Sequence, residues 1–445
     1  MAQKYKYLNL VNYNTFLLWD IKRYFMTQVA SSHPIVKLGD YIQEEGTKYN
    51  ISDKTKTYGI LGVNNQTGIF DAYEENGSKI KQKYKKMQVG WIAYNPYRVN
   101  VGSIGIRTEE HLFEYISPAY VVFSCKKGLL PEFLFLLMKT DLFNKIIREN
   151  TTGSVRQNLN YSVLSNLQIP LPSLEEQNKI IAAYNATIAQ AKQYSTQAKD
   201  IDKQIEKHLQ DELGLLKTSV SKKQNIVDKF IKLVHLKDIT RWDIYNLQNG
   251  DYNGKYNSQF LRDILISTPK YGAGYKAEKK HSDVRYIRIT DINEDGSLND
   301  DFASVSQYDN QYLLKQNDFL IARTGNTVGK TFLYDESMGK AIYAGYLIKF
   351  ELNTEKVNPQ YLLAYTKSSI YTQWIKSNMR ISAQPNINCK QYEESPIILP
   401  PLNIQNEIVE HITALRKKQK DLQQKSLTLR QQATQQFEQT IFSVI

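Results

Sequence analysis

The chain has 445 residues, of which 57 are Lys or Arg and 45 are Asp or Glu, giving a net charge of +12. A hydrophobic content of 41% is enough for two to four globular domains and excludes a wholly disordered chain. Two cysteines, Cys125 and Cys389, exclude a disulfide scaffold and a cysteine-based zinc site, and six histidines leave little for a metal-binding cluster.

Each half of the chain begins with a region in which short strands alternate with loops. Runs of β-branched and aromatic residues, separated by Gly and Asn, predict strands, in chain order at Tyr58–Val63, Gly90–Tyr94, Tyr120–Ser124, Arg285–Thr290, Asp318–Ala322 and Ala344–Phe350. A helix is expected after these strands in each half, at Pro131–Asn150 and Pro359–Asn378, because proline suits the first helical position. The predicted fold class is α+β, with a mixed α/β region in both halves.

A proline-rich stop and then a long polar helix follow in each half. The stops are Ile169–Pro172 and Leu399–Leu402. No proline interrupts the chain from Leu174 to Leu213, or from Leu402 to the C-terminus, so we expect a helix over each range.

Residues in both helices recur at seven-residue spacing, which is the pattern of a coiled-coil seam with polar residues in its middle. The rows of the first helix are Ile181, Ile188, Ser195, Asp202, Leu209 and Tyr184, Ala191, Ala198, Ile205, Glu212. The rows of the second are Ile408, Leu415, Leu422, Leu429 and Ile412, Gln419, Ser426, Ala433. We expect the two helices to pair with each other; one face of an ordinary helical bundle is the alternative.

The sequence repeats itself with a period of domain size. At an offset of 223, residues Leu10-Val11, Trp19–Ile21, Leu38 and Asp40 match Leu233-Val234, Trp242–Ile244, Leu261 and Asp263. At an offset of 228, the matches include Pro131 with Pro359, Lys139 with Lys367, Asn158 with Asn386, and Gln177-Asn178 with Gln405-Asn406. A tandem duplication of this length predicts approximate twofold symmetry, which suits a reader of a two-part ligand.

The basic charge lies mainly in the regions that precede the long helices. Residues 1–172 hold 21 basic and 14 acidic side chains, and residues 221–401 hold 24 and 20. This excess, with 31 tyrosines and many amides, suits a polar anionic surface such as nucleic acid. A genome of low GC content is the alternative explanation of the composition.

Several chemical motifs are approached but not completed. Gly325–Thr331 has three residues between its glycines where a P-loop needs four, and Phe332–Tyr334 looks extended rather than helical. Gly272–Ala277 is a lone loose dinucleotide pattern, Asn95–Tyr97 lacks the second proline of an amino-methyltransferase loop, and Glu278–Lys280 lacks the upstream half of a nuclease motif. We therefore expect a binding protein without a catalytic centre, a bound cofactor or a metal site.

Together, the repeat, the proline-rich stop and the helical arm resemble the specificity subunits of Type I restriction–modification systems. Thr152–Ser154, Asn158-Leu159, Ile169–Gln177 and Ile180 are similar to that family's Gly-Ser turn and "IPLPPLxEQ" junction, which Ile398–Gln405 repeats. Asp318–Gly325 with Gly329-Lys330 is similar to its "GDILIARTG…GK" segment. Asp318 is taken to correspond to Gly90, and the first copy has no Arg-Thr-Gly, which predicts that the two domains read different sequences.

The resemblance implies a non-catalytic subunit with two target-recognition domains, separated by two conserved helices that form an antiparallel coiled coil with pseudo-twofold symmetry. The expected boundaries are 1–172 and 218–401 for the recognition domains, with 173–217 and 402–445 for the helical spacers. The implied partners are double-stranded DNA with a bipartite target, two methyltransferase subunits and two ATP-dependent restriction/translocase subunits. We expect one copy of this chain in that hetero-oligomer, with S-adenosylmethionine, ATP and Mg on the partners and none on this chain.

Loops that combine Asn, Tyr, Lys and Arg are the best candidates for reading base edges and holding phosphates. In the first domain we expect DNA contacts from Lys54, Lys56, Asn64, Asn65, Gln66, Tyr94, Asn95, Tyr97, Arg98 and Arg107. In the second domain we expect them from Lys276, Arg285, Arg288, Arg323, Asn326 and Lys330. Turn residues that recur in both copies are expected to be structural instead, namely Ser154, Arg156, Asn158, Ser382, Gln384 and Asn386.

Two other functions are compatible with the sequence. A Type IIB-like system would use the same kind of subunit but place cleavage in the methyltransferase partner. A structural coiled-coil protein with duplicated β-rich heads is a rival of a different class, although it would not need basic heads. Since Asn, Lys, Asp and Arg interrupt the first 25 residues, and the apolar run Phe133–Met138 is too short to span a bilayer, we expect a cytoplasmic protein without membrane contact.

Overall fold

The computed structural model describes residues 27, 29–99, 102–150, 158–215, 254–279, 282–379 and 384–442. They form two compact units. Unit 1 holds the described residues up to Tyr194 together with those from Gln424 onward, and unit 2 holds those from Ser195 to Gln423. The part of the predicted repeat near Leu10 and Trp19, with its match near Leu233 and Trp242, lies outside the described residues.

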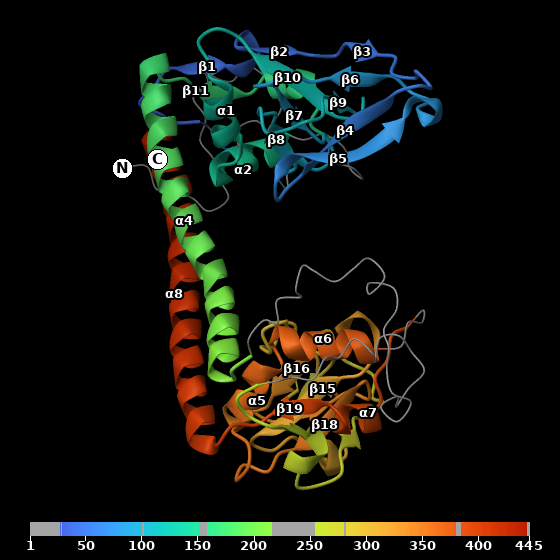
Figure 1. Ribbon diagram of the computed structural model, residues 1–445. Helices are drawn as coiled ribbons and strands as arrows, with labels where there is room; N and C mark the ends of the chain where they lie inside the picture. Colours follow the sequence, from blue (N-terminus) through green and yellow to red (C-terminus); the bar gives the residue numbers. More distant parts are fainter. Residues whose placement is uncertain are drawn as a thin grey trace, which may run out of the picture. The chain divides into compact units, whose positions relative to one another are not determined.

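Unit 1 contains two sheets and a short strand pair (Figure 1). The four-stranded antiparallel sheet has the order β2-β10-β7-β8, made by β2 (Ile42–Glu44), β7 (Ile92–Tyr94), β8 (Ile104–Ile106) and β10 (Val121–Cys125). The five-stranded sheet has the order β3-β6-β9-β4-β5, made by β3 (Lys48–Tyr49), β4 (Thr57–Asn64), β5 (Gly68–Asn76), β6 (Tyr84–Lys86) and β9 (Tyr115–Ile116). This sheet is mixed because β4 and β9 run parallel. The short pair is β1 (Ile35–Lys37) with β11 (Gln168–Pro170).

Three short helices and parts of two long helices complete unit 1. The short ones are α1 (Pro131–Met138), α2 (Asp141–Asn150) and α3 (Tyr161–Ser165), and the long ones are α4 (Leu174–Glu212) and α8 (Leu402–Ile441). The C-terminal end of α8 enters the core of this unit, where the ring of Phe437 lies 5.7 Å from Phe133 and 6.3 Å from Tyr184. A segment from the end of the chain therefore completes the core of the first head.

Unit 2 repeats the four-stranded sheet, the antiparallel strand pair and the three short α-helices of unit 1, but the described residues hold no counterpart of the five-stranded sheet. A four-stranded antiparallel sheet, β13-β18-β15-β16, is made by β13 (Lys270–Tyr271), β15 (Asp318–Ala322), β16 (Thr331–Leu333) and β18 (Leu347–Glu351). The strand pairs are β12 (Ser258–Phe260) with β19 (Pro396–Ile398), antiparallel, and β14 (Arg285–Ile287) with β17 (Ala341–Tyr343), parallel. The short helices are α5 (Pro359–Tyr365), α6 (Ser369–Asn378) and α7 (Cys389–Glu393).

Matching hydrogen bonds confirm the duplication. The Leu38 amide donates to the carbonyl of Leu167, and the Leu261 amide donates to that of Ser395, both at 2.9 Å. Asn160 and Asn388 cap α3 and α7, each accepting from the third amide of its helix. The two copies thus use the same local contacts at the same places.

The predicted helices at Pro131–Asn150 and Pro359–Asn378 are each two helices, so this prediction was wrong in one respect. Thr140 ends α1 by donating to the Leu137 carbonyl at 2.7 Å, and its hydroxyl accepts from the Phe143 amide in α2. Ser368 does the same between α5 and α6, with Tyr365 and Tyr371 as its partners. One hydroxyl that caps the next helix is enough to break the run.

The predicted strands are confirmed, with shifted ends. β14 stops at Ile287 and β18 begins at Leu347, because the Leu347 amide donates to Ala344 in a turn. The proposed correspondence of Gly90 with Asp318 was off by one residue. Gly90 and Asn317 occupy the same position before their strands and both have a left-handed backbone, with φ of 82° and 69°. Asparagine is the non-glycine residue that best tolerates this conformation.

A buried glutamine explains the junction after each proline-rich stop. Gln177 accepts from the Leu130 amide and donates to the carbonyls of Gly128 and Pro172, all at 2.9 Å. Its counterpart Gln405 accepts from Asn358 at 2.7 Å and donates to Lys356 at 3.1 Å and Pro400 at 2.8 Å. Each side chain is fully buried. It therefore joins the start of a long helix to the loop before α1 or α5 with no polar group left over.

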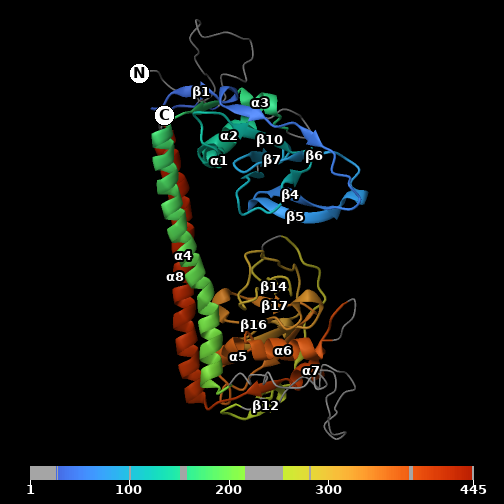
Figure 2. The same cartoon turned by 45° about the horizontal axis from the view of Figure 1, so that its top comes forward.

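The two long helices lie side by side (Figures 1 and 2) and pack antiparallel within each unit. In unit 1, Ser426 Oγ donates to the Ala191 carbonyl at 2.8 Å. In unit 2, Gln419 Nε2 donates to Ala198 O and to Asp202 Oδ2, both at 3.0 Å. The predicted row Ile412, Gln419, Ser426 and Ala433 is buried throughout. No helix of the described ranges combines the length and apolarity needed to cross a membrane.

Several of the tyrosines, whose number we linked to an anionic surface, lie in the hydrophobic cores instead. Tyr343, Tyr361, Tyr365 and Tyr392 are among the largest fully buried side chains. The hydroxyl of Tyr361 donates to Ile398 O at 2.6 Å and that of Tyr392 to Ala322 O at 2.9 Å. Buried tyrosines of this kind give apolar contact and one satisfied polar end.

The glutamine junctions give a stability prediction. Replacing Gln405 with Met leaves one amide and two carbonyls without their partner, so we expect unit 2 to lose about 2–4 kcal/mol of unfolding free energy. Gln177→Met should cost unit 1 the same. Scanning calorimetry of the full chain measures both. The exposed Gln423→Met is the control, expected within about 0.5 kcal/mol of the wild type; a Gln405→Met protein that melts with it would refute the role of the junction.

Candidate nucleic-acid interface

The best candidate residues lie in one loop that both units share. This loop joins β7 to β8 in unit 1 and β15 to β16 in unit 2. In each unit one backbone hydrogen bond joins the two ends of the loop. The Asn95 amide donates to Ser103 O at 3.1 Å, and the Ala322 amide donates to Lys330 O at 2.8 Å. A second strut also matches, because the Leu159 amide donates to Pro96 O and the Ile387 amide to Arg323 O, both at 3.0 Å. We call these segments, residues 95–103 and 322–330, the reader loops.

In unit 1 the reader loop presents Tyr97 and Arg98. Asn95 Oδ1 accepts from the Tyr97 amide at 3.0 Å, and the Arg98 amide donates to Asn95 O at 3.0 Å, so a tight turn fixes this segment. Tyr97 is 55% exposed and Arg98 is exposed. A rigid turn that carries an aromatic ring and a guanidinium suits stacking and hydrogen bonding to a polyanion.

The tip of the β4–β5 hairpin lies next to this loop. Ser103 Oγ donates to the Val63 carbonyl at 3.2 Å, and a Cβ added to Gly102 would lie 3.9 Å from that of Asn65. Asn64 Oδ1 accepts from the amides of Gln66 and Thr67, at 2.9 and 2.7 Å, so its side chain builds the turn. The exposed side chains of Asn65 and Gln66 are therefore brought beside the reader loop.

In unit 2 the reader loop presents Arg323 on an aromatic platform. Its guanidinium carbon lies 4.8 Å from the centre of the Tyr271 ring, and its amide donates to Tyr346 O at 3.0 Å. Tyr271 and Tyr346 are 44% and 53% exposed. Stacking holds the guanidinium plane in one orientation, which lowers the entropy lost on binding. Asn326, in the same loop, is exposed.

The aromatic platform formed by Tyr271 was not predicted from the sequence. Tyr271 lies 52 residues before Arg323 along the chain and meets it only because β13 and β15 both flank β18. A second missed feature is the run of five lysines from Lys79 to Lys86, which the sequence shows directly. Within it Lys81 and Lys83 are exposed, whereas Lys85 is buried and donates to Tyr120 O at 2.8 Å.

Lys54 and Lys56 are exposed but lie away from the reader loop. They precede β4, whereas Asn64 ends it, and eight residues of strand span about 25 Å. Lys56 also lies 3.7 Å from Asp53. In unit 2, Lys276 is exposed in the segment that follows β13.

Tyr94 was predicted to face DNA, and this prediction is wrong. Its side chain is fully buried with its ring 6.2 Å from that of Phe123, and burial raises the pKa of its hydroxyl well above the usual range. All three residues of β7 are fully buried, so both faces of this strand lie in the core and Tyr94 cannot reach a ligand.

Three predicted arginines are engaged in structural bonds instead. Arg107 donates to the carbonyls of Phe113 at 2.9 Å and His111 at 3.4 Å. Arg285 donates to Asn299 O at 2.6 Å. The guanidinium of Arg288 lies 2.7 Å from the buried Asp291 carboxylate and 3.0 Å from Asp301, and these hydrogen bonds, led by the one to Asp291, raise its pKa. Each one fastens the loop that follows its strand.

Lys330 and the turn residues have assigned partners too. Lys330 Nζ lies 2.9 Å from the carboxylate of Glu294. Gly325 and Gly329 have φ of 68° and 86°, so both serve the turn geometry, and a Cβ on Gly329 would also approach Ile375 to 2.8 Å. The segment after them, β16, is extended as predicted. Ser154, Arg156 and Ser382 lie outside the described residues, and no group of three or more His, Cys, Asp and Glu side chains that could hold a metal occurs among those that are described.

A duplicated chain that presents an arginine-bearing loop with the same backbone frame in both copies has the organisation of a two-headed DNA-recognition protein. The family model of the Type I restriction modification DNA specificity domain matches residues 35–210 and 253–429, and the chain belongs to this family. The predicted resemblance to Type I specificity subunits is thereby confirmed. Membership argues against the rival reading as a purely structural coiled-coil protein.

Two curated relatives and one solved structure are similar to the chain. The Type I restriction enzyme EcoBI specificity subunit of Escherichia coli is 22% identical over 278 residues, 60% of this chain and 56% of the relative. The StySPI specificity subunit of Salmonella potsdam is 20% identical over 302 residues, 65% and 59% of the two chains. The match therefore spans less than two thirds of either relative. A chain from a structure described as the basis of complex assembly and conformational transition of the type I R-M system has a TM-score of 0.56 at 15% identity, over 93% of this chain and 97% of that one, which supports the fold.

The structural assignment of Arg288 can be tested without DNA. Arg288→Met leaves the Asp291 carboxylate buried without its cation, so we expect a loss of about 3 kcal/mol of local stability. Hydrogen exchange of the amides in 285–301 should then accelerate strongly. The exposed Lys276→Met is the matched loss of one charge and should leave this segment unchanged. Equal exchange in both variants would show that Arg288 does not hold the loop.

Proposed function

We propose that the chain is the DNA-recognition subunit of a restriction–modification complex, in which each unit reads one half of a bipartite duplex target. The single observation that supports this most is the reader loop, which has the same backbone frame in both units but different side chains. Tyr97 and Arg98 in one copy stand where Thr324 and Gly325 stand in the other. A shared frame with different contact residues is what two readers of different sequences require.

Base reading is assigned to exposed and half-buried residues of the reader loops and their neighbours. An arginine fork makes two hydrogen bonds to the edge of guanine, and an asparagine or glutamine amide does so to adenine. Arg98, Asn65 and Gln66 supply these groups in unit 1, and Arg323 and Asn326 supply them in unit 2. Phosphate contacts, which set register but carry no sequence information, are assigned to exposed lysines such as Lys54, Lys81 and Lys276.

The paired helices are proposed as the spacer and as the docking site for partner subunits. They contain 39 and 40 residues, and an α-helix of this length extends about 60 Å. Two methyltransferase subunits and, in the complete complex, two restriction/translocase subunits are the proposed partners. Methylation and cleavage, with S-adenosylmethionine, ATP and Mg, are assigned to those partners, and this chain binds none of these cofactors in our proposal.

Reader-loop variants should change one half of the target only. We expect Arg98→Ala to relax one or two base positions in one half-site, and Arg323→Ala to do so in the other, each at about 1–3 kcal/mol of discrimination. Methylation-site mapping of the variants assembled with their methyltransferase partner reports both halves at once. Lys127→Ala, which removes an exposed cation outside the reader loops and the long helices, controls for charge. Loss at both halves, or at neither, would contradict the assignment.

The spacer can be tested by lengthening it. Four residues, about one turn, inserted in α4 after Ser195 and in α8 after Gln423 lengthen each helix by about 6 Å, or one to two base pairs of DNA. We expect both half-sites to persist with a longer gap between them. An insertion in α4 alone should instead misalign the Ser426 and Gln419 bonds and lower stability. An unchanged gap in a fully active double insertion would show that the helices do not set the spacing.

A further inference from the structure

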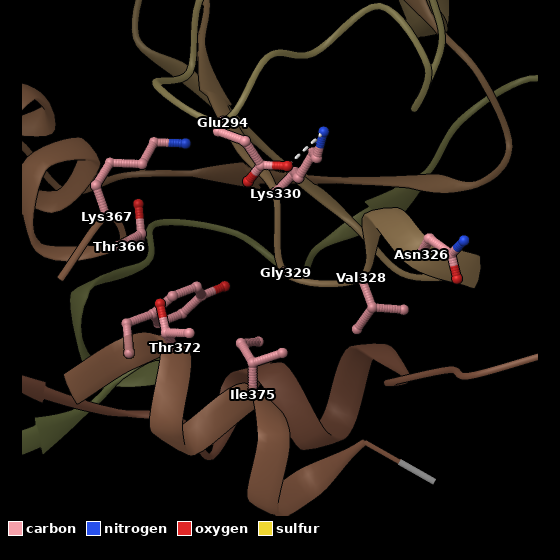
Figure 3. Close-up of a pocket in the computed structure, with 10 residues that line it drawn as sticks. Glu294, Asn326, Val328, Gly329, Lys330, Thr366, Lys367, Thr372 and Ile375 are labelled. Atoms are coloured by element: carbon pink, nitrogen blue, oxygen red, sulfur yellow. Dashed lines mark ion pairs between the residues drawn. The ribbon is translucent and has the colours of Figure 1, made fainter. Parts of the chain in front are cut away.

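A cavity of about 270 Å³ lies in unit 2 directly behind the reader loop (Figure 3). Four parts of the chain line it: Asn326 and Val328–Lys330 of the loop, the junction of α5 and α6 at Thr366 and Lys367, the first turns of α6, and Glu294. Thr372 and Ile375 of α6 form one side, and Glu294 and Lys330 face it from the other. The predicted DNA contacts Asn326 and Lys330 are therefore both part of one concave site.

Two lysine ammonium groups converge on this cavity. Lys330 Nζ lies 2.9 Å from Glu294 and donates to Ile292 O at 3.3 Å. Lys367 Nζ donates to Thr331 O at 3.0 Å and has no carboxylate within ion-pair distance among the described residues. Glu294, Asp295, Lys330 and Arg416 are the charged groups that act on Lys367. Arg416 is itself paired with Asp202 at 2.6 Å, so Lys330 and Lys367 are the cations that face the cavity, with Glu294 and Asp295 as the nearby anions.

Tyr371 adds an uncommitted polar group to the cavity wall. Its side chain is 3% exposed, it lines the cavity, and its hydroxyl has no hydrogen-bond partner among the described residues. Its ring stacks on Trp374, at 6.2 Å between centres, so packing fixes its position. A buried hydroxyl without a partner costs free energy, and a ligand that accepts a hydrogen bond would remove that cost.

The loop backbone does not supply a phosphate cradle of the P-loop kind. Its amides are already used, since Val328 donates to Gly325 O, Gly329 to Ala322 O and Lys330 to Thr327 O. Any anion here must therefore be held by side chains. The volume suits a group of a few heavy atoms and is below the usual range for a whole nucleotide.

We propose that this cavity binds a phosphate group, which Lys367 and Lys330 neutralise and to which the Tyr371 hydroxyl donates. The site deepens the proposed DNA-reading function, because a phosphate of the DNA backbone held here would set the register of the neighbouring reader loop. Free inorganic phosphate has the same chemistry and is the other source. Glu294 is the internal competitor: its side chain is 86% exposed, so it can leave Lys330 when the anion arrives.

Burial of Lys367 makes its charged form unfavourable unless an anion is bound. It lowers the pKa of the ammonium to about 8, below the ordinary 10.5. A lysine whose folded-state pKa is depressed opposes folding while it is charged, and this penalty disappears as the pH rises from about 8 toward 10.5. Lys367→Met should therefore not destabilise unit 2 at pH 7, which separates loss of binding from loss of fold.

Tyr371→Phe is the sharpest variant, because it removes only the hydroxyl. That hydroxyl has no partner in the free protein, so the variant should be as stable as the wild type or more stable. We expect it to bind inorganic phosphate about tenfold more weakly. Tyr343→Phe is the matched control: its hydroxyl is also buried without a partner among the described residues, but it lies in the core at β17 and not in the cavity.

Charge variants should shift binding in opposite directions. Lys367→Met removes a cation and should weaken phosphate binding by about tenfold or more, whereas Glu294→Gln removes the competitor and should tighten it a few-fold. Calorimetric titration of the full chain with inorganic phosphate measures both. If the cavity holds only the structural ion pair of Lys330 and Glu294, the two variants should not change phosphate affinity in opposite directions.

A second arm with duplex DNA separates the two sources. If a backbone phosphate is the ligand, Tyr371→Phe and Lys367→Met lower duplex affinity by the same factor on every sequence, and Lys367→Met lowers the salt slope by about one. If free phosphate is the ligand, only the first arm responds. If Tyr371→Phe and Lys367→Met match Tyr343→Phe in both arms, the proposal is wrong. A wild-type chain that binds no duplex would refute the DNA-reading function and leave the phosphate arm to decide the cavity.

Discussion

Each head of this protein is closed by a helix that comes from the other half of the chain. In unit 1 the rings of Phe133 and Phe437 meet in the core, although 304 residues separate them. In unit 2 the Glu206 carboxylate of α4 accepts from the amide and hydroxyl of Ser369 at the start of α6. Apolar burial and charge-assisted hydrogen bonds thus tie both heads to both helices. The C-terminal end of α8 therefore cannot leave unit 1 without opening its core.

Polar contacts between α4 and α8 also restrict the register in which the two helices can pair. Ser426 and Gln419 are buried and donate across the pair to backbone carbonyls, and Arg416 lies 2.6 Å from Asp202 beside them. Such polar contacts add little net stability but are satisfied in only one register, because a slip by one turn would leave them buried without partners. Buried Gln177 and Gln405 then fix each helix start to its own head. Polar contacts therefore fix both the register of the helix pair and the point where each helix leaves its head.

The sequence allowed prediction of what depends on short-range pattern. Helix periodicity, strand composition and the 228-residue repeat predicted the element order. Loops with Asn, Tyr, Lys and Arg supplied the candidates for DNA contact, some of which lie in the reader loops. Contacts between segments that lie far apart in the chain could not be predicted in this way. A single hydroxyl at Thr140 split an apolar run that reads as one helix, the Tyr271 platform under Arg323 forms only through the sheet, and Tyr94 has the composition of a reader but the position of a core residue. Arg288 was misjudged although its partner, Asp291, lies three residues away.

The central proposal is that the two units act as independent readers and recognise two separated half-sites. Mapping every methylated position in DNA treated with the unmodified chain and its methyltransferase partners tests it most directly. We predict a single motif made of two specified half-sites, different in sequence, with a gap of fixed length in which any base is accepted. One contiguous motif, two half-sites with a variable gap, or methylation without sequence preference would contradict the account.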